Sequence, residues 1–215
     1  MNATSPPGHR HAATLEDSFD FLNTDELDGA GHPIEGLPSL PDATGWLVDR
    51  GMLHPEQRAT IEGSKPSPAG VPLARVHAAR AALRGIVEAL VADRPADPDD
   101  LAAVNAVLQA RSVPELVPGD GTLAIGHRHV GDPLDDALGG LAEPLVSLIA
   151  AGDVWRLRIC ANDGCRWVFH DTSRTGRRRW CSMASCGNRA KAARHRARKR
   201  IAAAPSAADV GPTPA

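Results

Sequence analysis

Apolar residues along most of this chain recur at steps of three and four, the spacing of a helix that buries one face. Residues 71–94 hold the longest such stripe, which predicts a helix with these positions turned inward: Leu73, Val76, Ala79, Leu83, Ile86, Val87 and Leu90. Residues 133–152 repeat the pattern, and Pro144 is expected to kink this second helix or to mark a restart. Shorter helices are predicted at 41–52, 55–62 and 98–110.

The same pattern indicates the extent of a front domain. Residues 14–152 show neither an internal repeat nor the strand–helix alternation of a parallel sheet, so we expect a mainly α-helical domain. Weak alternation near 115–130, beside the turn-forming pair Asp120-Gly121, allows one small β-hairpin. Residues 1–13 and 204–215 lack periodicity and contain Pro and Gly, so both ends are expected to be disordered.

Composition indicates the cellular setting. Apolar residues make up 42% of the 215 residues, which is enough for a core. No apolar run reaches the roughly 18 residues of a membrane-spanning helix, and the first residues lack the basic start and apolar centre of a signal peptide. We therefore expect a soluble, cytoplasmic protein with no membrane partner. In that reducing compartment, clustered cysteines favour a metal site over disulfides.

From residue 153 to residue 203 the pattern is that of a small second module. Residues 154–160 alternate and residues 166–169 can return beside them, which predicts a half-buried hairpin. Its inward face is predicted to hold Trp155, Leu157, Ile159, Trp167 and Phe169. A helix of alanine and basic residues is predicted from Gly187. One face of that helix carries small or apolar side chains and suits packing on the cysteine module or on a partner. Its residues are Ala190, Ala193, Ala197 and Ile201.

All four cysteines of the chain lie in this module, as two pairs with the same gap of four residues: Cys160, Cys165, Cys181 and Cys186. Asn162, Asp163 and Gly164 tolerate the left-handed backbone of a tight turn, so the first two thiolates can point at one spot. Two equal pairs separated by 15 residues fit a tetrahedral structural Zn²⁺ site with no ligand position open for catalysis. Buried free cysteines and a redox-labile cluster are the alternatives.

Charge divides the chain into the same two parts. Residues 1–150 carry 22 Asp and Glu against 10 Lys and Arg, a net charge of −12, whereas residues 151–201 carry 14 Lys and Arg against 3 Asp, a net charge of +11. Such asymmetry predicts a polyanion-binding end, with a solvated surface or a dock for the acidic front domain as alternatives. Arginine suits phosphate oxygens and guanine edges. The candidate nucleic-acid-binding residues are Arg174, Arg177, Arg178, Arg179, Arg189, Lys191, Arg194, Arg196 and Arg198.

The front domain offers a weaker candidate site. His77, Arg80 and Arg84 lie along one predicted helix and could hold an anionic small-molecule effector, although solvation on a helix surface is the favoured interpretation. The chain has no phosphate-binding loop, nucleophile motif or paired carboxylates. We therefore expect no catalytic residue and no enzyme.

The cysteine module also resembles a known family. The segments C-x4-C-x-W-x-F-x-D-x-S-R and R-R-W-C-S-M-A-x-C-G-N-R-x-K-x-x-R-x-R, within roughly residues 154–200, resemble the CGNR zinc finger, named for the tetrapeptide at 186–189. The front half resembles the all-α ABATE domain that precedes this finger in bacterial proteins. The matching pieces are FDFLNT at 19–24, LPDATGWLVDRGML at 40–53 and ARAALRGIVEAL at 79–90.

The resemblance implies a bacterial transcription regulator with Zn²⁺ on the four cysteines and a DNA-binding C-terminal module. It places the family's Asp-x-Ser-Arg element on Asp171, Ser173 and Arg174. Asp171 would cap or salt-link the loop that presents Arg174 and the arginines at 177–179, or else this element would contact nucleic acid directly. Asn188 would cap the basic helix, and Asn23 matches an Asn of the family pattern.

We therefore expect a zinc-dependent regulator that binds duplex DNA, with the front domain as a sensor for a small-molecule effector. One alternative is an RNA-binding module whose aromatic rings stack on bases, although most of these rings are expected to be core. The other is a redox or metal sensor that acts through the cysteines.

Overall fold

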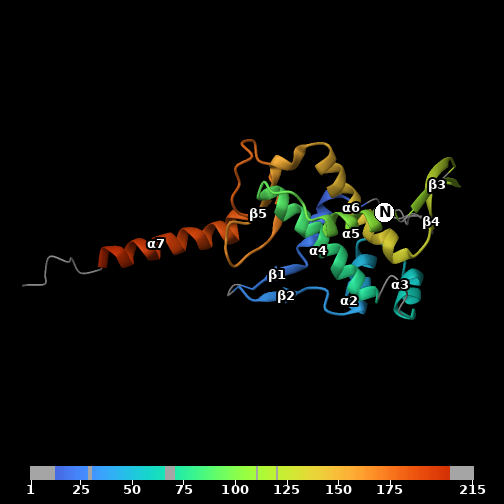
Figure 1. The fold of residues 1–215 in the computed structure, drawn as a ribbon, viewed down its shortest axis with the longest axis horizontal. Coiled ribbons are helices and arrows are strands. Elements are labelled where there is room, and N and C mark those ends of the chain that lie inside the picture. Colours follow the sequence, from blue (N-terminus) through green and yellow to red (C-terminus); the bar gives the residue numbers. More distant parts are fainter. Residues whose placement is uncertain (1–12, 29–30, 66–70, 110, 120, 204–215) are drawn as a thin grey trace, which may run out of the picture.

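The computed structural model describes residues 13–28, 31–65, 71–109, 111–119 and 121–203 (Figure 1). The predicted disorder of residues 1–13 and 204–215 lies outside this part of the chain, apart from Ala13. The front part is built from helices, in chain order α1 (Leu15–Leu22), α2 (Leu40–Asp49), α3 (Pro55–Glu62), α4 (Pro72–Val91), α5 (Pro98–Leu108) and α6 (Pro133–Ala150). The described C-terminal part contains a 3₁₀ turn η1 (Asp153–Arg156), a π-helical turn η2 (Met183–Gly187) and the helix α7 (Asn188–Ala203).

The strands of the described residues form two-stranded antiparallel hairpins: β1 (Asp25–Leu27) with β2 (Pro33–Glu35), β3 (Arg111–Pro118) with β4 (Leu123–Val130), and β5 (Leu157–Ile159) with β6 (Val168–His170). The mainly α-helical class is confirmed, and so is the small hairpin allowed near 115–130. The hairpin β1–β2 and the helix α1 were not predicted. The strands of this hairpin are only three residues long, too short to show a period. Of the two alternatives at Pro144, a kink or a restart, the restart is excluded, since α6 continues through this residue.

Polar residues that accept backbone N–H groups explain where the helices begin. Thr14 and Asp17 form a reciprocal capping box at the start of α1. Ser39, Asp97 and Asp132 cap α2, α5 and α6 with their side-chain oxygens, and a proline follows each in the first turn. The starts of these helices were therefore encoded locally.

The core of the front part lies around α4, which packs against α1, α2, α5 and α6. The predicted stripe of α4 is buried, including Val76, Leu83 and Val87, and the stripe of α6 meets it with residues such as Leu141. Burial of each such side chain stabilises the fold by roughly 1.5–3 kcal/mol. Gly139 lets α5 and α6 approach closely, because a Cβ there would lie 2.5 Å from the carbonyl oxygen of Val107.

The hairpin β5–β6 packs on this same core. Leu157 and Val168 are buried within the helical core cluster, and β5 contacts α4 while β6 contacts α1. The predicted inward face of the hairpin is wrong in part. Trp155 precedes the strand in η1 and is 51% exposed, and Trp167 is 38% exposed. Phe169 is buried but pairs across the sheet with Arg158, on the face opposite Leu157.

Two of the three basic candidates on α4, Arg80 and Arg84, are buried rather than solvated, so the favoured interpretation is wrong for them. Arg80 is buried, pairs with the Glu35 carboxylate and donates a hydrogen bond of 2.7 Å to Thr24 Oγ1. Arg84 is buried and donates to backbone carbonyls. His77 Nε2 lies 2.9 Å from the Leu37 carbonyl oxygen. Because protein groups contact all three side chains, these residues do not form an open anion site.

Among the helices that the structure describes, none is both long enough and apolar enough to cross a membrane.

Candidate metal centre and nucleic-acid interface

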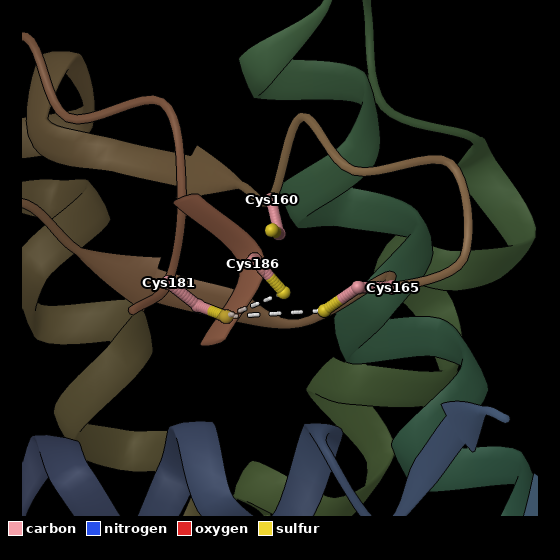
Figure 2. Close-up of side chains that lie close together, drawn as sticks. All are labelled: Cys160, Cys165, Cys181 and Cys186. Carbon is pink, nitrogen blue, oxygen red and sulfur yellow. Dashed lines mark hydrogen bonds between the residues drawn. The ribbon is translucent and has the colours of Figure 1, made fainter. Parts of the chain in front are cut away.

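The four cysteines converge on one point although two separate segments supply them (Figure 2). Cys160 follows β5, Cys165 precedes β6, Cys181 ends the basic loop and Cys186 lies within η2. Their Sγ atoms all lie within 4.8 Å of one another, and the Cys165–Cys181 and Cys181–Cys186 pairs are each 3.8 Å apart.

This arrangement fits a tetrahedral zinc ion. Zinc–sulfur bonds of about 2.3 Å give a tetrahedron whose edges are about 3.8 Å, the separation seen for two of the sulfur pairs. All four thiols are free of disulfides. The donor set of four sulfurs and no oxygen is the one that zinc takes in structural sites.

Burial and mutual repulsion disfavour the thiolate forms of Cys165 and Cys181 when no metal ion is present. Burial and the neighbouring Cys160 raise the pKa of Cys165 to about 11, and burial with the charges of Cys160 and Cys165 raises the pKa of Cys181 further. Burial acts the same way on Cys186, but hydrogen bonds from Asn162 and the other thiols lower its pKa to about 7. Four thiolates repel one another here unless a divalent metal ion neutralises them.

The first pair of cysteines is held by backbone hydrogen bonds. Cys165 N donates to the Asn162 carbonyl oxygen at 2.8 Å, which closes the turn, and Cys160 N donates to the Trp167 carbonyl oxygen at 2.9 Å. The Asn162 side chain donates to Cys186 Sγ at 3.4 Å and so joins the two pairs. The predicted left-handed backbone is wrong, because none of residues 162–164 has a positive φ.

The second pair lies on an unusual helix start. Ser182 caps η2, and Gly187 N donates to the Ser182 carbonyl oxygen at 2.9 Å, the five-residue step of a π turn. A Cβ at Gly187 would lie 2.7 Å from Sδ of the half-exposed Met183, so a larger residue here would displace the Met183 side chain. The predicted Asn188 cap is wrong, since Asn188 lies inside the helical run and donates to the Ala184 carbonyl oxygen at 3.1 Å.

The basic loop, residues 172–180, is fixed by Asp171. This side chain is 0% exposed and accepts hydrogen bonds from Ser173 N at 2.9 Å and Arg178 N at 2.7 Å. Burial favours its neutral form, but hydrogen bonds from Ser173 and Arg178 outweigh burial and lower the pKa of Asp171 to about 2. The capping interpretation of Asp171 is therefore confirmed, and its burial is inconsistent with direct contact to nucleic acid.

Two further contacts hold the loop against the hairpin. Arg156 Nη1 donates to the carbonyl oxygens of Asp171 at 2.6 Å and Ser173 at 3.0 Å. Gly176 has φ of +60°, and a Cβ there would lie 2.5 Å from the Trp155 ring. The half-exposed Trp155 is thus covered on one side by the loop.

The candidate basic residues are distributed over this loop and α7. Arg174, Arg177 and Arg179 are exposed, as are the candidates on α7, which are Arg189, Lys191, Arg194, Arg196 and Arg198. Arg178 differs, because it donates to the Cys181 carbonyl oxygen at 2.5 Å and lies 4.9 Å from the centre of the Phe169 ring. Arg178 therefore supports the metal centre directly.

The helix α7 extends away from the helical part of the molecule and packs against η2 at its start (Figure 1). Ala193 and Ala197 are exposed, so the expectation that the small face covers the cysteine module is wrong for these two residues. The side chain of Ile201 lies outside the described residues. The basic helix is thus accessible from several sides.

A cavity of about 330 Å³ opens beside the thiols between β1 and η2. Its lining includes Glu26, Trp167 and Arg189 together with Cys165 and Cys181. Chelators or oxidants in solvent can therefore approach the centre from this side.

The sequence did not reveal that Asn162, Asn23 and Arg84 support the metal centre. Asn162 contacts the second cysteine pair, and Asn23 and Arg84 bind the backbone next to Cys165 from the helical part. The sequence did allow a role for Asn162 to be predicted, because an Asn side chain in a short turn often forms hydrogen bonds to nearby groups. The other two act across more than 80 residues of sequence, so no local pattern identifies them.

Comparison with protein-family models agrees with this geometry. The model for ABATE, described as "Putative stress-induced transcription regulator", matches residues 18–152, and the model for the CGNR zinc finger matches residues 156–199. No protein in a search of the curated proteins matches the chain. The two family matches confirm the resemblance found in the sequence, and the description points to a regulator of transcription rather than to an enzyme.

Proposed function

Because this chain belongs to the ABATE family and carries a CGNR zinc finger, we propose that it regulates transcription by binding duplex DNA through a surface that Zn²⁺ assembles. The observation that carries the proposal is the placement of Cys181 and Cys186. They end the basic loop and begin the basic helix, so one ion on the four thiolates fixes both relative to the hairpin. The zinc has a structural role in this proposal.

The positions along α7 support a role in DNA binding. An α-helix turns by about 100° per residue, so Ala190, Ala193 and Ala197 fall on one narrow strip. Basic residues flank both edges of that strip. One edge carries Arg189, Arg196 and Arg200, and the other carries Lys191, Arg194 and Arg198.

These dimensions match the major groove of duplex DNA. The groove is about 12 Å wide and admits a helix, and the 16 residues of α7 extend over about 24 Å. The alanine strip allows close approach to the base edges, while the two basic edges reach phosphates on opposite strands. Arg189, Arg194 or Arg196 would read bases, and Arg174, Arg177 and Arg179 of the loop would add phosphate contacts.

A salt titration of the full zinc-loaded chain on duplex DNA tests this proposal. The logarithm of the binding constant should fall steeply with the logarithm of salt concentration, and each lost phosphate contact should lower the slope by about 0.9. The double variant Arg194→Ala/Arg198→Ala removes two charges from one edge of α7. Arg94→Ala is the control, because Arg94 is exposed on the front domain. A double variant that retains the slope of the control refutes the assignment of α7.

The exposed rings favour a second candidate function, binding of single-stranded RNA. Trp155 is 51% exposed with the Arg156 guanidinium 4.1 Å from its ring centre, and Trp167 is 38% exposed. Such rings can stack on unpaired bases. The same titration on single-stranded RNA distinguishes the two functions, since tighter binding to RNA that is lost in Trp155→Ala favours the second.

A further inference from the structure

We propose that the helical domain forms part of the scaffold of the metal centre, with Asn23 and Arg84 as positioning residues for the arm that carries Cys160 and Cys165. Zinc binding and the stability of α1 and α4 are then coupled in both directions. This inference rests on the zinc of the proposed function but not on DNA binding.

Asn23 takes the place of a neighbouring strand for β6. It ends α1, is only 6% exposed, and donates from Nδ2 to the Val168 carbonyl oxygen at 2.9 Å. Its Oδ1 accepts from Val168 N at 2.8 Å. One side-chain amide thus satisfies both backbone groups of a buried residue, as a paired strand would.

Arg84 holds the residue directly after Cys165. It is 3% exposed and donates to the carbonyl oxygens of Arg166 at 2.9 Å and Leu22 at 2.6 Å. Burial, with the charge of Arg166, lowers the pKa of Arg84, and the carboxylate of Asp25 at 3.8 Å acts in the opposite direction. A buried cation bonded to both parts of the chain tolerates little displacement of either part.

The three residues after Cys165 are each bound by the helical part. Arg84 binds Arg166, Asn23 binds Val168, and the Glu26 carboxylate accepts from Trp167 Nε1 at 3.1 Å. The Trp167 carbonyl oxygen in turn accepts from Cys160 N. The position of both cysteines in this arm therefore depends on α1, β1 and α4.

The coupling follows from what changes when the metal leaves. Small zinc modules lose their order without the ion, because the metal–thiolate bonds supply much of their folding free energy. The contacts to Asn23 and Arg84 exist only while the arm is ordered, so their free energy adds to that of zinc binding. By reciprocity, bound zinc stabilises α1 and α4.

The first test measures the zinc dissociation constant of the full chain by competition with a chromophoric chelator. Asn23→Ala should weaken zinc binding by roughly tenfold, the effect typical of groups that orient metal ligands. Ser18→Ala is the matched control, because Ser18 lies on α1, is also buried, and donates to the Leu141 carbonyl oxygen at 2.7 Å within the helical part. Equal dissociation constants for the two variants overturn the coupling.

A second measurement needs no variant and covers the case in which Asn23→Ala fails to fold. Hydrogen exchange of the wild-type chain should slow on addition of zinc at the end of α1 and around Arg84 in α4, but not in α3. Slowing confined to residues 153–203 overturns the coupling and leaves the proposed function intact. A wild-type chain that binds no zinc overturns both.

Discussion

Replacement of Asp171 tests whether a buried carboxylate holds the basic loop in its binding geometry. The variant Asp171→Ala leaves Ser173 N and Arg178 N without their acceptor. Hydrogen bonds to a charged group contribute roughly 1.5–3 kcal/mol each. Loss of two such bonds should cost about 3 kcal/mol or more of loop stability, reduced where water enters to replace the carboxylate.

The expected result is a loss of DNA affinity with zinc still bound. The loop that carries Arg177 and Arg179 would no longer be held in one geometry, so we expect roughly tenfold weaker binding, the effect of about 1.4 kcal/mol. Fluorescence anisotropy on duplex DNA gives the affinity, and metal analysis of the same sample gives the zinc content. Asp163→Ala is the matched control, because it removes an exposed carboxylate from the same module.

Two outcomes would refute the reasoning. If Asp171 faced the nucleic acid, its removal would relieve repulsion from phosphate and DNA binding would become stronger. If Asp171→Ala bound DNA as tightly as Asp163→Ala with unchanged thermal stability, the carboxylate would not hold the loop.

Three further predictions follow from the same geometry. Because the pKa of Asp171 in the folded chain is about 2 rather than 3.8, its stabilising effect is present above pH 4 and is lost only as the pH falls from there towards 2. Urea denaturation gives the free energy of unfolding of the wild type and of Asp171→Asn, and the difference between them should thus stay constant from pH 8 to pH 5. A difference that shrinks over this range contradicts the lowered pKa of Asp171. Gly187→Ala should change stability by only about 0.5 kcal/mol, because the half-exposed Met183 side chain can move away from the new Cβ. A loss of several kcal/mol in thermal denaturation would contradict this. Arg178→Ala should weaken zinc binding in a chelator competition, because the Arg178 guanidinium bonds to the Cys181 carbonyl oxygen. Arg177→Ala is the control and should leave zinc binding unchanged. Equal zinc affinities for the two variants would contradict the role of Arg178 in supporting the metal centre.

The sequence was sufficient where local chemistry decides the structure. The helix starts depend on a capping side chain and a following proline, as at Asp132 and Pro133, and the stripes of α4 and α6 depend on one period each. The cysteine cluster was predictable because two equally spaced pairs in one short segment favour one metal ion. Asp171 could be placed as a loop cap through its resemblance to a family element.

The rest depended on contacts between distant segments. Asn23 and Val168 lie 145 residues apart, so neither shows that the other satisfies its polar groups. Trp155 alternates with Leu157 in sequence, yet η1 ends between them and turns the ring to solvent. Arginines such as Arg80 and Arg84 usually lie on a helix surface. Their burial is explained by partners from distant segments, since Arg80 pairs with Glu35 and Arg84 donates to the carbonyl oxygens of Leu22 and Arg166.

The central claim is that zinc on the four cysteines creates the DNA-binding surface, and one titration tests it most directly. Duplex-DNA affinity of the full chain is measured with zinc bound, after removal of the metal by a chelator, and after zinc is restored. The account predicts tight, salt-dependent binding that is lost with the metal and recovers with it. Equal affinity for duplex DNA in the zinc-loaded and zinc-free chain would contradict the claim.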